Sequence, residues 1–391
     1  MFLDMTLKRN PNLIETAVKL HRAGIIRPNT YLIDIDTVRK NVRTLVKAAR
    51  ESQITLYMMT KQIGRNPDLA RIIAECGITR AVAVDPWEAI ILHQAGIKIG
   101  NVGHLVQIPS SFIQEILALA PETVTVFSTE KAREISDVAV KLGCKQNLLL
   151  KVMGPQDKVY EGQLGGFRED DLINEAKAIM KLPGVRIVGL TSFPCFLYDA
   201  KEGIVKQTEN INTIIRCASL LRSKLGLTLE QINTPSVNMV STFPLMHKLG
   251  ATHGEPGHSI TGTTPIHGYR EMPEIPAIVY VTEVSHLYED KAYTFGGGFY
   301  KRSQVKKAMV GTAFEVMRDN MLEAEEISAE SIDYYGTLRI GPNRAKVGDT
   351  AVYAFRTQIF VTRSEVALVE GVSTGVPRII GFYDGQGRRI N

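Results

Sequence analysis

The sequence predicts an α/β protein, a (β/α)8 TIM-type barrel followed by an antiparallel β domain. Eight short β-type runs alternate with amphipathic helical patterns over about 200 residues, a length typical of such a barrel. After Gly268 the rhythm changes, and apolar and polar residues alternate between Gly and Asp turns. The length of 391 residues also exceeds what one hydrophobic core normally supports. An open doubly wound sheet uses the same alternation, but the count of eight favours the closed barrel.

A helical extension is expected before the barrel. Residues 11–25 place apolar side chains at helical spacing, with Asn10 at the N-cap and Pro11 at the first helical position. The chain is therefore expected to divide into three parts. These are an N-terminal helical extension over residues 1–28, a barrel over residues 29–268 and a C-terminal β domain over residues 269–391.

The barrel strands are predicted as short apolar runs, each followed by a helical pattern. A strand and a long amphipathic helix within TYLIDIDTVRKNVRTLVKAARES come first. The eight expected strands cover residues 55–60, 80–84, 101–106, 124–128, 147–153, 186–192, 231–234 and 251–254. Helices between successive strands indicate parallel pairing, because a parallel pair needs a crossover connection.

Composition excludes several classes of protein. A hydrophobic share of 44% and a charged share of 22% indicate a globular protein with a sizeable core. The net charge of +5 comes from scattered residues without basic runs, so no nucleic-acid partner is expected. The four cysteines form no CxxC pair and the histidines no HxxxH pair, which argues against a metal site and favours the reducing cytoplasm. Neither a membrane span nor a signal peptide is recognisable, and no membrane association is expected.

The stretch LYMMTKQIG places Lys61 at the end of the first barrel strand. Functional groups of barrel enzymes lie at the carboxyl ends of strands. A lysine among apolar neighbours has a lowered pKa, which makes its neutral amine available for a Schiff base. Taken alone, a lysine whose ammonium reaches solvent is the commoner explanation.

Two polar loops favour a catalytic role for Lys61 over a lysine that only reaches solvent. The seventh strand leads into NTPSVNMVST and the eighth into ATHGEPGHSITGTT, both rich in small and hydroxyl-bearing residues. Loops after strands seven and eight are the usual phosphate site of barrel enzymes. Each loop by itself is equally explained as polar surface. A phosphate site combined with a strand-end lysine is what pyridoxal 5'-phosphate requires.

Several motifs together resemble a known family. They are TYLIDIDTVRKNV, the strand ending in Lys61, AVDPWEA, LLLKVMG with GQLGGF, GLTSFP and GEPGHSITG. In this order, over about residues 29–268, the chain resembles the alanine racemase-like, fold-type III family of pyridoxal phosphate enzymes, and most of all its YhfX-type branch. The region after residue 268 occupies the place of the family's C-terminal domain.

The resemblance implies roles for particular residues. Lys61 would form the Schiff base with the cofactor, and the phosphate would bind at Gly257 and His258 with help from Ser236 or Asn238. The implied cofactor-binding set is Lys61, Ser192, Ser236, Asn238, Glu255, Gly257, His258 and Ser259. Ser192 stands where racemases of the family commonly carry a histidine beneath the cofactor ring, which leaves Phe193 or a neighbour to pack there.

Glu255 is expected to be catalytic together with Lys61. Alanine racemases have an RPG motif that places an arginine near the pyridine nitrogen, whereas this chain has EPG, as the decarboxylase branch does. A carboxylate stabilises a protonated pyridine nitrogen and makes the ring a stronger electron sink. An exposed loop glutamate near a helix N-terminus is the alternative.

The second catalytic base of racemases has no clear counterpart. The segment AYTFGGGFY resembles the one that carries a tyrosine in racemases, but the matching position is Phe295, which cannot move a proton. Candidate replacements are Tyr293, Tyr300, His258, Tyr198 and Cys195.

The resemblance implies an enzyme that acts at the α-carbon of an amino acid, first of all a racemase or epimerase. A lyase or decarboxylase acting on a D-configured or unusual amino acid is the alternative, and a non-catalytic carrier of the cofactor is another. The additional β domain favours an enzyme, and it implies a homodimer with sites at the subunit interface, because in the family this domain typically covers the partner's site.

Overall fold

The computed structural model describes residues 1–300, 302–303, 305–328 and 330–390. The chain forms two compact units. The barrel unit comprises residues 43–60 and 70–257, and the β unit comprises residues 1–42, 61–69 and 258–391. Residues 29–42, 61–69 and 258–268, which the sequence assigned to the barrel segment, lie in the β unit.

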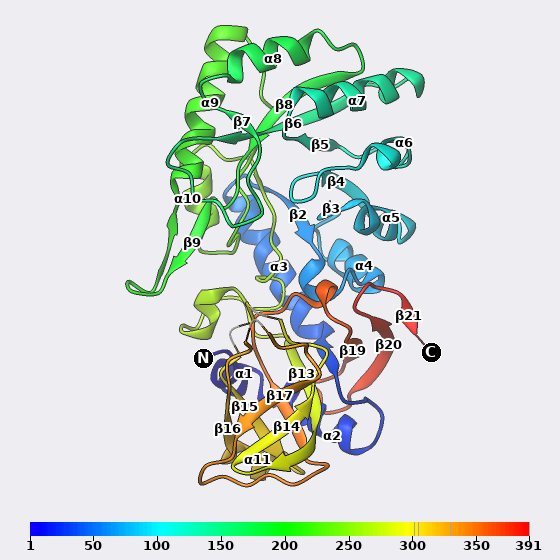
Figure 1. Ribbon diagram of the computed structural model, residues 1–391, viewed down its shortest axis with the longest axis vertical. Coiled ribbons are helices and arrows are strands. Elements are labelled where there is room, and N and C mark those ends of the chain that lie inside the picture. The colour runs from blue at the N-terminus through cyan, green and yellow to red at the C-terminus, as the bar shows by residue number, and fades with distance from the viewer. Residues whose placement is uncertain (301, 304, 329, 391) are drawn as a thin grey trace. The chain divides into compact units, whose positions relative to one another are not determined.

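Eight parallel strands form the closed barrel, and β2 to β6 and β8 are labelled in Figure 1. They are β2 (Thr55–Met59), β3 (Arg80–Ala83), β4 (Lys98–Val102), β5 (Thr123–Val126), β6 (Gln146–Met153), β8 (Val185–Thr191), β11 (Gln231–Asn233) and β12 (His253–Gly254). Each strand pairs in parallel with the next one named, and β12 pairs with β2 to complete the ring. The predicted eight-stranded barrel is confirmed.

β4 departs most from its predicted range. β4 ends at Val102, whereas the sequence predicted a strand as far as Val106. The strand stops because Gly103 adopts φ +90°, and a Cβ there would lie 2.5 Å from the carbonyl oxygen of Thr125. His104 therefore lies in the loop after β4.

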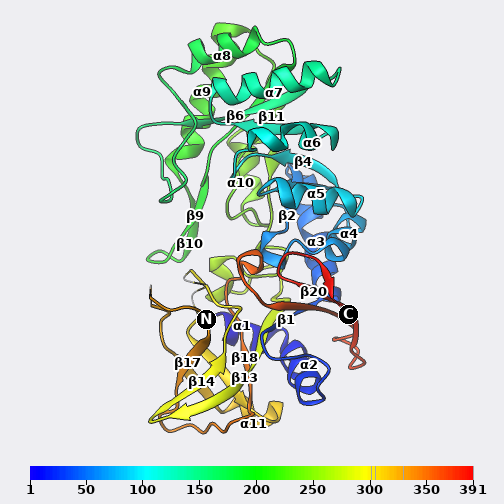
Figure 2. The same ribbon diagram turned by 45° about the vertical axis from the view of Figure 1, so that its right-hand side comes forward.

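Helices connect the strands. They are α3 (Ile35–Glu51), α4 (Pro67–Glu75), α5 (Pro86–Gln94), α6 (Ile113–Ala118), α7 (Thr129–Lys141), α8 (Leu172–Met180), α9 (Glu209–Leu225) and α10 (Phe243–Lys248), with a short 3-10 turn η2 (Ser110–Phe112). Helices α5, α6 and α7 lie along the outside of β3 to β6 (Figures 1 and 2). Local sequence fixes their starts: the side chain of Asp85 caps α5 and that of Ser128 caps α7.

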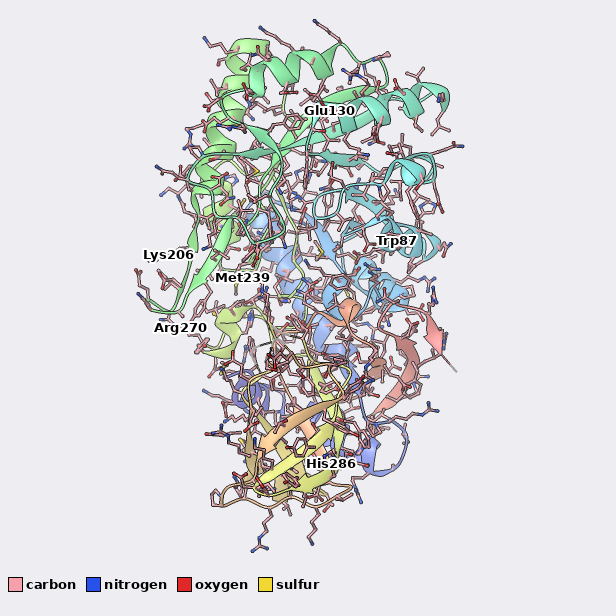
Figure 3. The ribbon with its side chains drawn as sticks, in the orientation of Figure 1. Trp87, Glu130, Lys206, Met239, Arg270 and His286 are labelled. Carbon is pink, nitrogen blue, oxygen red and sulfur yellow. The ribbon has the colours of Figure 1, made fainter. Side chains whose placement is uncertain are left out.

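Three short strands of the barrel unit were not predicted from the sequence. β7 (Phe167–Arg168) pairs with the end of β6. β9 (Phe196–Asp199) and β10 (Ile204–Gln207) form an antiparallel hairpin after β8, and Lys206 projects from it in Figure 3. The hairpin is held by polar contacts, since Lys206 donates to Asp199 at 2.9 Å.

The β unit contains a sheet with a second closed ring. Six antiparallel strands pair in the cycle β13 (Ile278–Tyr288), β18 (Thr350–Tyr353), β15 (Lys307–Gly311), β16 (Met321–Ala324), β17 (Tyr335–Arg339) and β14 (Lys291–Phe295). The sheet continues from β13 through β1 (Thr30–Asp34), β19 (Glu365–Glu370), β20 (Arg378–Asp384) and β21 (Arg389–Ile390). β1 runs parallel to β19, and the other strand pairs of this sheet are antiparallel among the described residues. The predicted antiparallel β domain is confirmed.

The N-terminal helices α1 (Phe2–Arg9) and α2 (Pro11–Arg22) pack against this sheet. Leu13 and Ile14 are fully buried in one apolar core with Val279 and Val352. Asn10 occupies the N-cap position of α2, as expected, but its amide donates to Asp34 and to the carbonyl of Pro276, each at 3.0 Å, so it joins the helix pair to the sheet.

The remaining elements of the β unit are short. They are the 3-10 turns η1 (Lys61–Ile63), η3 (Pro265–Gly268) and η4 (Ile359–Val361) and the helix α11 (Phe314–Arg318). Within the described part of the chain, no helix has the length and apolar character that crossing a membrane requires.

Candidate active site

The chain leaves the barrel strand β2 directly before Lys61. Thr60, the last barrel-unit residue before the lysine, is fully buried and donates from its hydroxyl to the carboxylate of Glu88. The other carboxylate oxygen of Glu88 accepts from the backbone N–H of Val84 at 2.6 Å. Glu88 lies on α5 next to Trp87, which is labelled in Figure 3. One buried carboxylate thus ties the ends of β2 and β3 together and fixes the backbone from which Lys61 begins.

Lys61 begins η1 in the β unit. The hydroxyl of Thr357 donates to the carbonyl of Gln62 at 3.0 Å, which anchors this turn to the segment after β18. Burial, followed by the charges of Arg356 and Lys61, holds the pKa of His258 well below its usual range. Lys61, His258 and Arg356 therefore lie close together, and His258 is neutral at physiological pH.

The protonation of His258 follows from its contact with Arg356. Arg356 donates from Nε to Nε2 of His258 at 3.0 Å. The neutral ring must then carry its proton on Nδ1. Nδ1 is buried and has no hydrogen-bond partner among the described residues. The hydroxyl of Tyr300 is likewise buried without a described partner. Two hydrogen-bond donors and a guanidinium in one region are suited to an anion.

Ser259, which was predicted to bind the cofactor, is fully buried in the β unit. It opens a tight segment in which the N–H of Gly262 donates to its carbonyl, and the hydroxyls of Thr261 and Thr263 bond each other at 2.9 Å. This predicted loop is therefore a buried polar turn and does not lie on the surface. Gly257 is the last residue of the barrel unit before it.

In the barrel unit, the loop after β11 has an unusual backbone. Ser236 and Val237 adopt φ +90° and +48°, a region that L-residues seldom occupy. Such backbone strain persists only where surrounding structure enforces it, and it is concentrated at functional sites. The hydroxyl of Ser236 donates to the carbonyl of Phe196 at 2.8 Å. Met239, labelled in Figure 3, lies on the same loop.

Asn238 shapes this loop from within. Its Nδ2 donates to the carbonyl of Thr234 at 3.0 Å, and its Oδ1 accepts from the backbone N–H of Glu255 at 2.6 Å. The side chain predicted to touch the cofactor therefore connects the loops after β11 and β12. Two of the residues predicted for the phosphate, Ser236 and Asn238, are brought together, with both side chains engaged in loop contacts.

Glu255 is buried immediately after β12. Asn233, the last residue of β11, donates from Nδ2 to Oε1 of Glu255 at 2.6 Å. Asn233 Oδ1 and the hydroxyl of Thr234 are buried without described partners. The alternative of an exposed loop glutamate does not apply in this structure, because Glu255 is only 6% exposed.

Ser192 lies at the end of β8, where the resemblance expects a histidine. Its hydroxyl accepts from Asn210 at 3.1 Å, so it is held by α9. Aromatic rings gather at the next residue, with Phe193 lying 5.9 Å from His104 and 5.7 Å from Tyr160 between ring centroids. Aromatic side chains therefore gather directly after Ser192 in the chain.

The candidate second bases lie in different surroundings. Phe295 ends β14 and packs 6.1 Å from Tyr335, and Tyr293 stacks on His286, which is labelled in Figure 3, at 4.5 Å. Burial raises the pKa of Tyr300 to about 12. Burial also raises the pKa of Cys195 far above its usual value, which makes the neutral thiol a poor base. Tyr198 lies on β9.

Sequence reasoning missed the roles of three residues. Arg356 follows the strand run AVYAF and carries no motif, so nothing in the sequence pairs it with His258. Glu88 stands in the motif AVDPWEA, and its apolar flanks signal burial. Lys151 in LLLKVM interrupts an apolar strand, a signal that a buried lysine leaves in the sequence. In the described residues, no group of histidine, cysteine, aspartate or glutamate side chains could hold a metal ion.

Similarity to known protein families defines the class to which this chain belongs. The alanine racemase N-terminal domain family matches residues 33–265, and the YhfX-like C-terminal domain family matches residues 279–379. The first match covers more than half of the chain, so the chain belongs to the alanine racemase N-terminal domain family.

One relative matches from end to end. The chain is 40% identical over 390 residues to the uncharacterized protein YhfX of Escherichia coli K12, with 100% of both chains covered. Solved structures share the fold. Alanine racemase of Clostridium difficile 630, in complex with cycloserine, matches with a TM-score of 0.63 and 16% identity, covering 92% of this chain and 98% of that one. Diaminopimelate decarboxylase of M. jannaschii matches with a TM-score of 0.64 and 14% identity, covering 96% and 92%.

Proposed function

We propose that this protein is a pyridoxal 5'-phosphate-dependent enzyme that exchanges the proton at the α-carbon of an amino acid, as a racemase or epimerase does. The family match supports the cofactor. The observation that carries the proposal is the burial of unpartnered polar atoms at His258, which the resemblance assigns to the phosphate, and at Asn233 and Thr234 at the end of β11. His258 Nδ1, Asn233 Oδ1 and Thr234 Oγ1 are all buried without described partners, as expected for groups that complete their hydrogen bonds on a ligand.

The residues fit the chemical groups of that cofactor. Lys61 supplies a primary amine for its aldehyde, and Glu255, oriented by Asn233, supplies a buried carboxylate for the pyridine nitrogen. The donors of His258 and Arg356, which lie together in the β unit, suit a phosphate. When bound, the cofactor supplies an electron sink for charge that develops at the α-carbon.

In this proposal the chain's own groups hold and move protons. Lys61 would take the α-proton with its amine and return it. Glu255 would accept a hydrogen bond from the protonated pyridine nitrogen, and Asn233 holds the carboxylate in place. The neutral state of His258 allows it to donate from Nδ1 without adding a positive charge.

A lyase or decarboxylase reaction is the second candidate, and Glu255 favours it. The EPG motif is shared with the decarboxylase branch, and the fold is shared with a diaminopimelate decarboxylase. A carboxylate at the ring nitrogen favours any reaction that leaves a carbanion at the α-carbon, whether a proton or carbon dioxide departs.

Borohydride reduction of the purified protein, followed by peptide mapping, tests the cofactor. We expect the cofactor mass on the peptide that contains Lys61, and no such mass in Lys61→Met. Lys98→Met is the matched control, because Lys98 is an exposed lysine at the start of β4 and should leave the labelling intact. Reduction without any mass at Lys61 would contradict the proposal.

Solvent exchange then separates the reactions. A panel of D- and L-amino acids in deuterium oxide should show deuterium at the α-carbon without net loss of the amino acid if the enzyme is a racemase or epimerase. Release of carbon dioxide or a carbonyl product would favour the second candidate. A labelled Lys61 without exchange or product on the whole panel would indicate a carrier of the cofactor.

The proposal includes a homodimer with sites at the subunit interface, as the resemblance implies. Light scattering on the eluted protein measures its mass, and a mass of 43.3 kDa at all concentrations would contradict the dimer.

A further inference from the structure

Lys151 on β6 is a buried cation that the proposed chemistry does not use. Its side chain points into the barrel, as the strand register shows. Tyr57 on β2 bonds Gln231 on β11 at 2.9 Å although β12 lies between these strands, so both side chains lie inside the ring. Asn233 follows Gln231 by two residues and therefore faces the same way. Thr191 is level with Asn233 and Lys151 is level with Thr191, so all three face inward.

The surroundings of the Lys151 ammonium are nearly apolar. Lys151 is 5% exposed, its Nζ donates to the carbonyl of Gln163 at 3.0 Å, and it lies 4.2 Å from the ring centroid of Phe127. An ammonium has three N–H donors, and one carbonyl and one ring face leave at least one of them unsatisfied. No described carboxylate lies within ion-pair distance of this nitrogen.

Such a charge is costly unless a ligand completes its surroundings. Burial lowers the pKa of Lys151 to about 8. At pH 7 a pKa of about 8 still leaves about ten charged lysines for each neutral one. The group is therefore chiefly a cation at this pH, which suits it to bind an anion.

We propose that Lys151 binds the carboxylate of the amino-acid substrate, an inference that rests on the proposed function. The position of Lys151 within the barrel suits this role. Lys151 lies level with the last residue of β8, at the carboxyl ends of the strands where barrel enzymes bind their substrates.

A carboxylate would satisfy the free donors of the Lys151 ammonium in a site of low dielectric, where a charge-assisted hydrogen bond is strong. Binding would then raise the pKa of Lys151, because an adjacent anion favours the charged form. The phenyl ring of Phe127 keeps the ammonium on one side and limits its movement.

Trace acetylation of the holoenzyme, read by peptide mapping, tests the proposal with propionate as the probe. We expect propionate to lower the acetylation of Lys151 at least fivefold and to move its titration midpoint above pH 8. Propylamine, which has no carboxylate, should do neither. Unchanged reactivity of Lys151 at saturating propionate would overturn the proposal.

Variants provide the second measurement. Lys151→Met should weaken propionate binding by at least tenfold in calorimetry, and Lys151→Arg should restore most of it. Lys145→Met is the matched control, since Lys145 is an exposed lysine just before β6 and should bind propionate like the parent. Equal binding by Lys151→Met and the parent would overturn the proposal, and if Lys151→Met does not fold, the acetylation of the parent protein decides.

The same peptide maps separate this inference from the proposed function. Borohydride labelling of Lys61 reports on the cofactor, and acetylation of Lys151 reports on the carboxylate. If propionate protects Lys151 but Lys61 is not labelled, the carboxylate site is supported and the cofactor proposal is contradicted. If Lys61 is labelled but propionate does not protect Lys151, the cofactor proposal is supported and the role of Lys151 is contradicted. For any substrate found, Lys151→Met should raise KM more than it lowers kcat.

Discussion

Arg356 donates from Nε to Nε2 of His258 at 3.0 Å, and this bond determines which nitrogen of the histidine carries a proton. Because Nε2 accepts, the buried and unpartnered Nδ1 of His258 is a donor. A guanidinium that fixes a neutral histidine as a donor contributes both charge and orientation to an anion site.

Replacement of Arg356 by methionine should weaken binding of pyridoxal phosphate by about tenfold to a hundredfold. The loss corresponds to one hydrogen bond to a charged group, about 1.5–3 kcal/mol. Titration of the apoprotein with the cofactor, followed by fluorescence, measures it. Arg344→Met is the control, because Arg344 is exposed in the loop after β17. If Arg356→Met binds the cofactor as tightly as Arg344→Met does, the assignment of Arg356 to the phosphate is contradicted.

Glu255→Gln should leave the cofactor bound and slow the reaction at the α-carbon by about a hundredfold or more, a magnitude typical of losing one preorganised electrostatic contact. The neutral amide keeps the shape of the side chain but no longer stabilises a protonated pyridine nitrogen. The exchange of deuterium into a responsive amino acid gives the rate. Asn233→Ala, which removes the 2.6 Å bond but keeps the carboxylate, should have a smaller effect. The reverse order of the two variants would argue against an electrostatic role for Glu255.

The sequence predicts the barrel well because its signal is local and repeated. Each strand is a short apolar run and each helix follows it with its own period, so the ranges agree with the structure within a few residues. β4 is an exception, since the backbone conformation of Gly103 depends on the nearby carbonyl of Thr125. The hairpin of β9 and β10 was missed because its four-residue strands, FLYD and IVKQ, show no alternation of apolar and polar residues.

The candidate site is harder to predict from the sequence than the barrel is. Lys61 and Glu255 stand in motifs at strand ends, where a barrel gathers its functional groups. Arg356 cannot be placed in this way, because 98 positions separate it from His258 and no period connects them. The same holds for β1, whose pairing with β13 and β19 joins the start of the chain to its end. Contacts of such long range depend on the complete fold.

Glu88→Gln should destabilise the protein by about 1.5–3 kcal/mol, the usual contribution of hydrogen bonds to a charged group. The buried carboxylate accepts from Thr60 and from the backbone of Val84, and an amide can accept at only one of these positions. Denaturant unfolding measures the change. Glu115→Gln on the exposed side of α6 is the control and should stay within about 0.5 kcal/mol of the parent.

Glu88 is also expected to position Lys61, which a stability measurement alone does not show. In Glu88→Gln the borohydride reduction of Lys61 should become slower at a denaturant concentration where the protein remains folded. A slower reduction in Glu88→Gln but not in Glu115→Gln would support positioning. If the borohydride reduction of Lys61 is equally fast in both variants, Glu88 contributes to stability but does not position Lys61.

His253 should make the protein sensitive to acid. Burial, followed by the charge of Arg80, lowers the pKa of His253 to about 4, and its ring packs 5.2 Å from that of Tyr57. An unfolded histidine titrates near pH 6.5, so between pH 6.5 and 4 the unfolded state gains a proton that the folded state does not. The free energy of unfolding therefore falls as the pH falls through this window, by about 3 kcal/mol in total. Above pH 6.5 the histidine adds no pH dependence. Denaturant unfolding at a series of pH values measures the slope, which should flatten in His253→Leu. A parent and a variant with the same slope would show that the acid sensitivity arises from other groups.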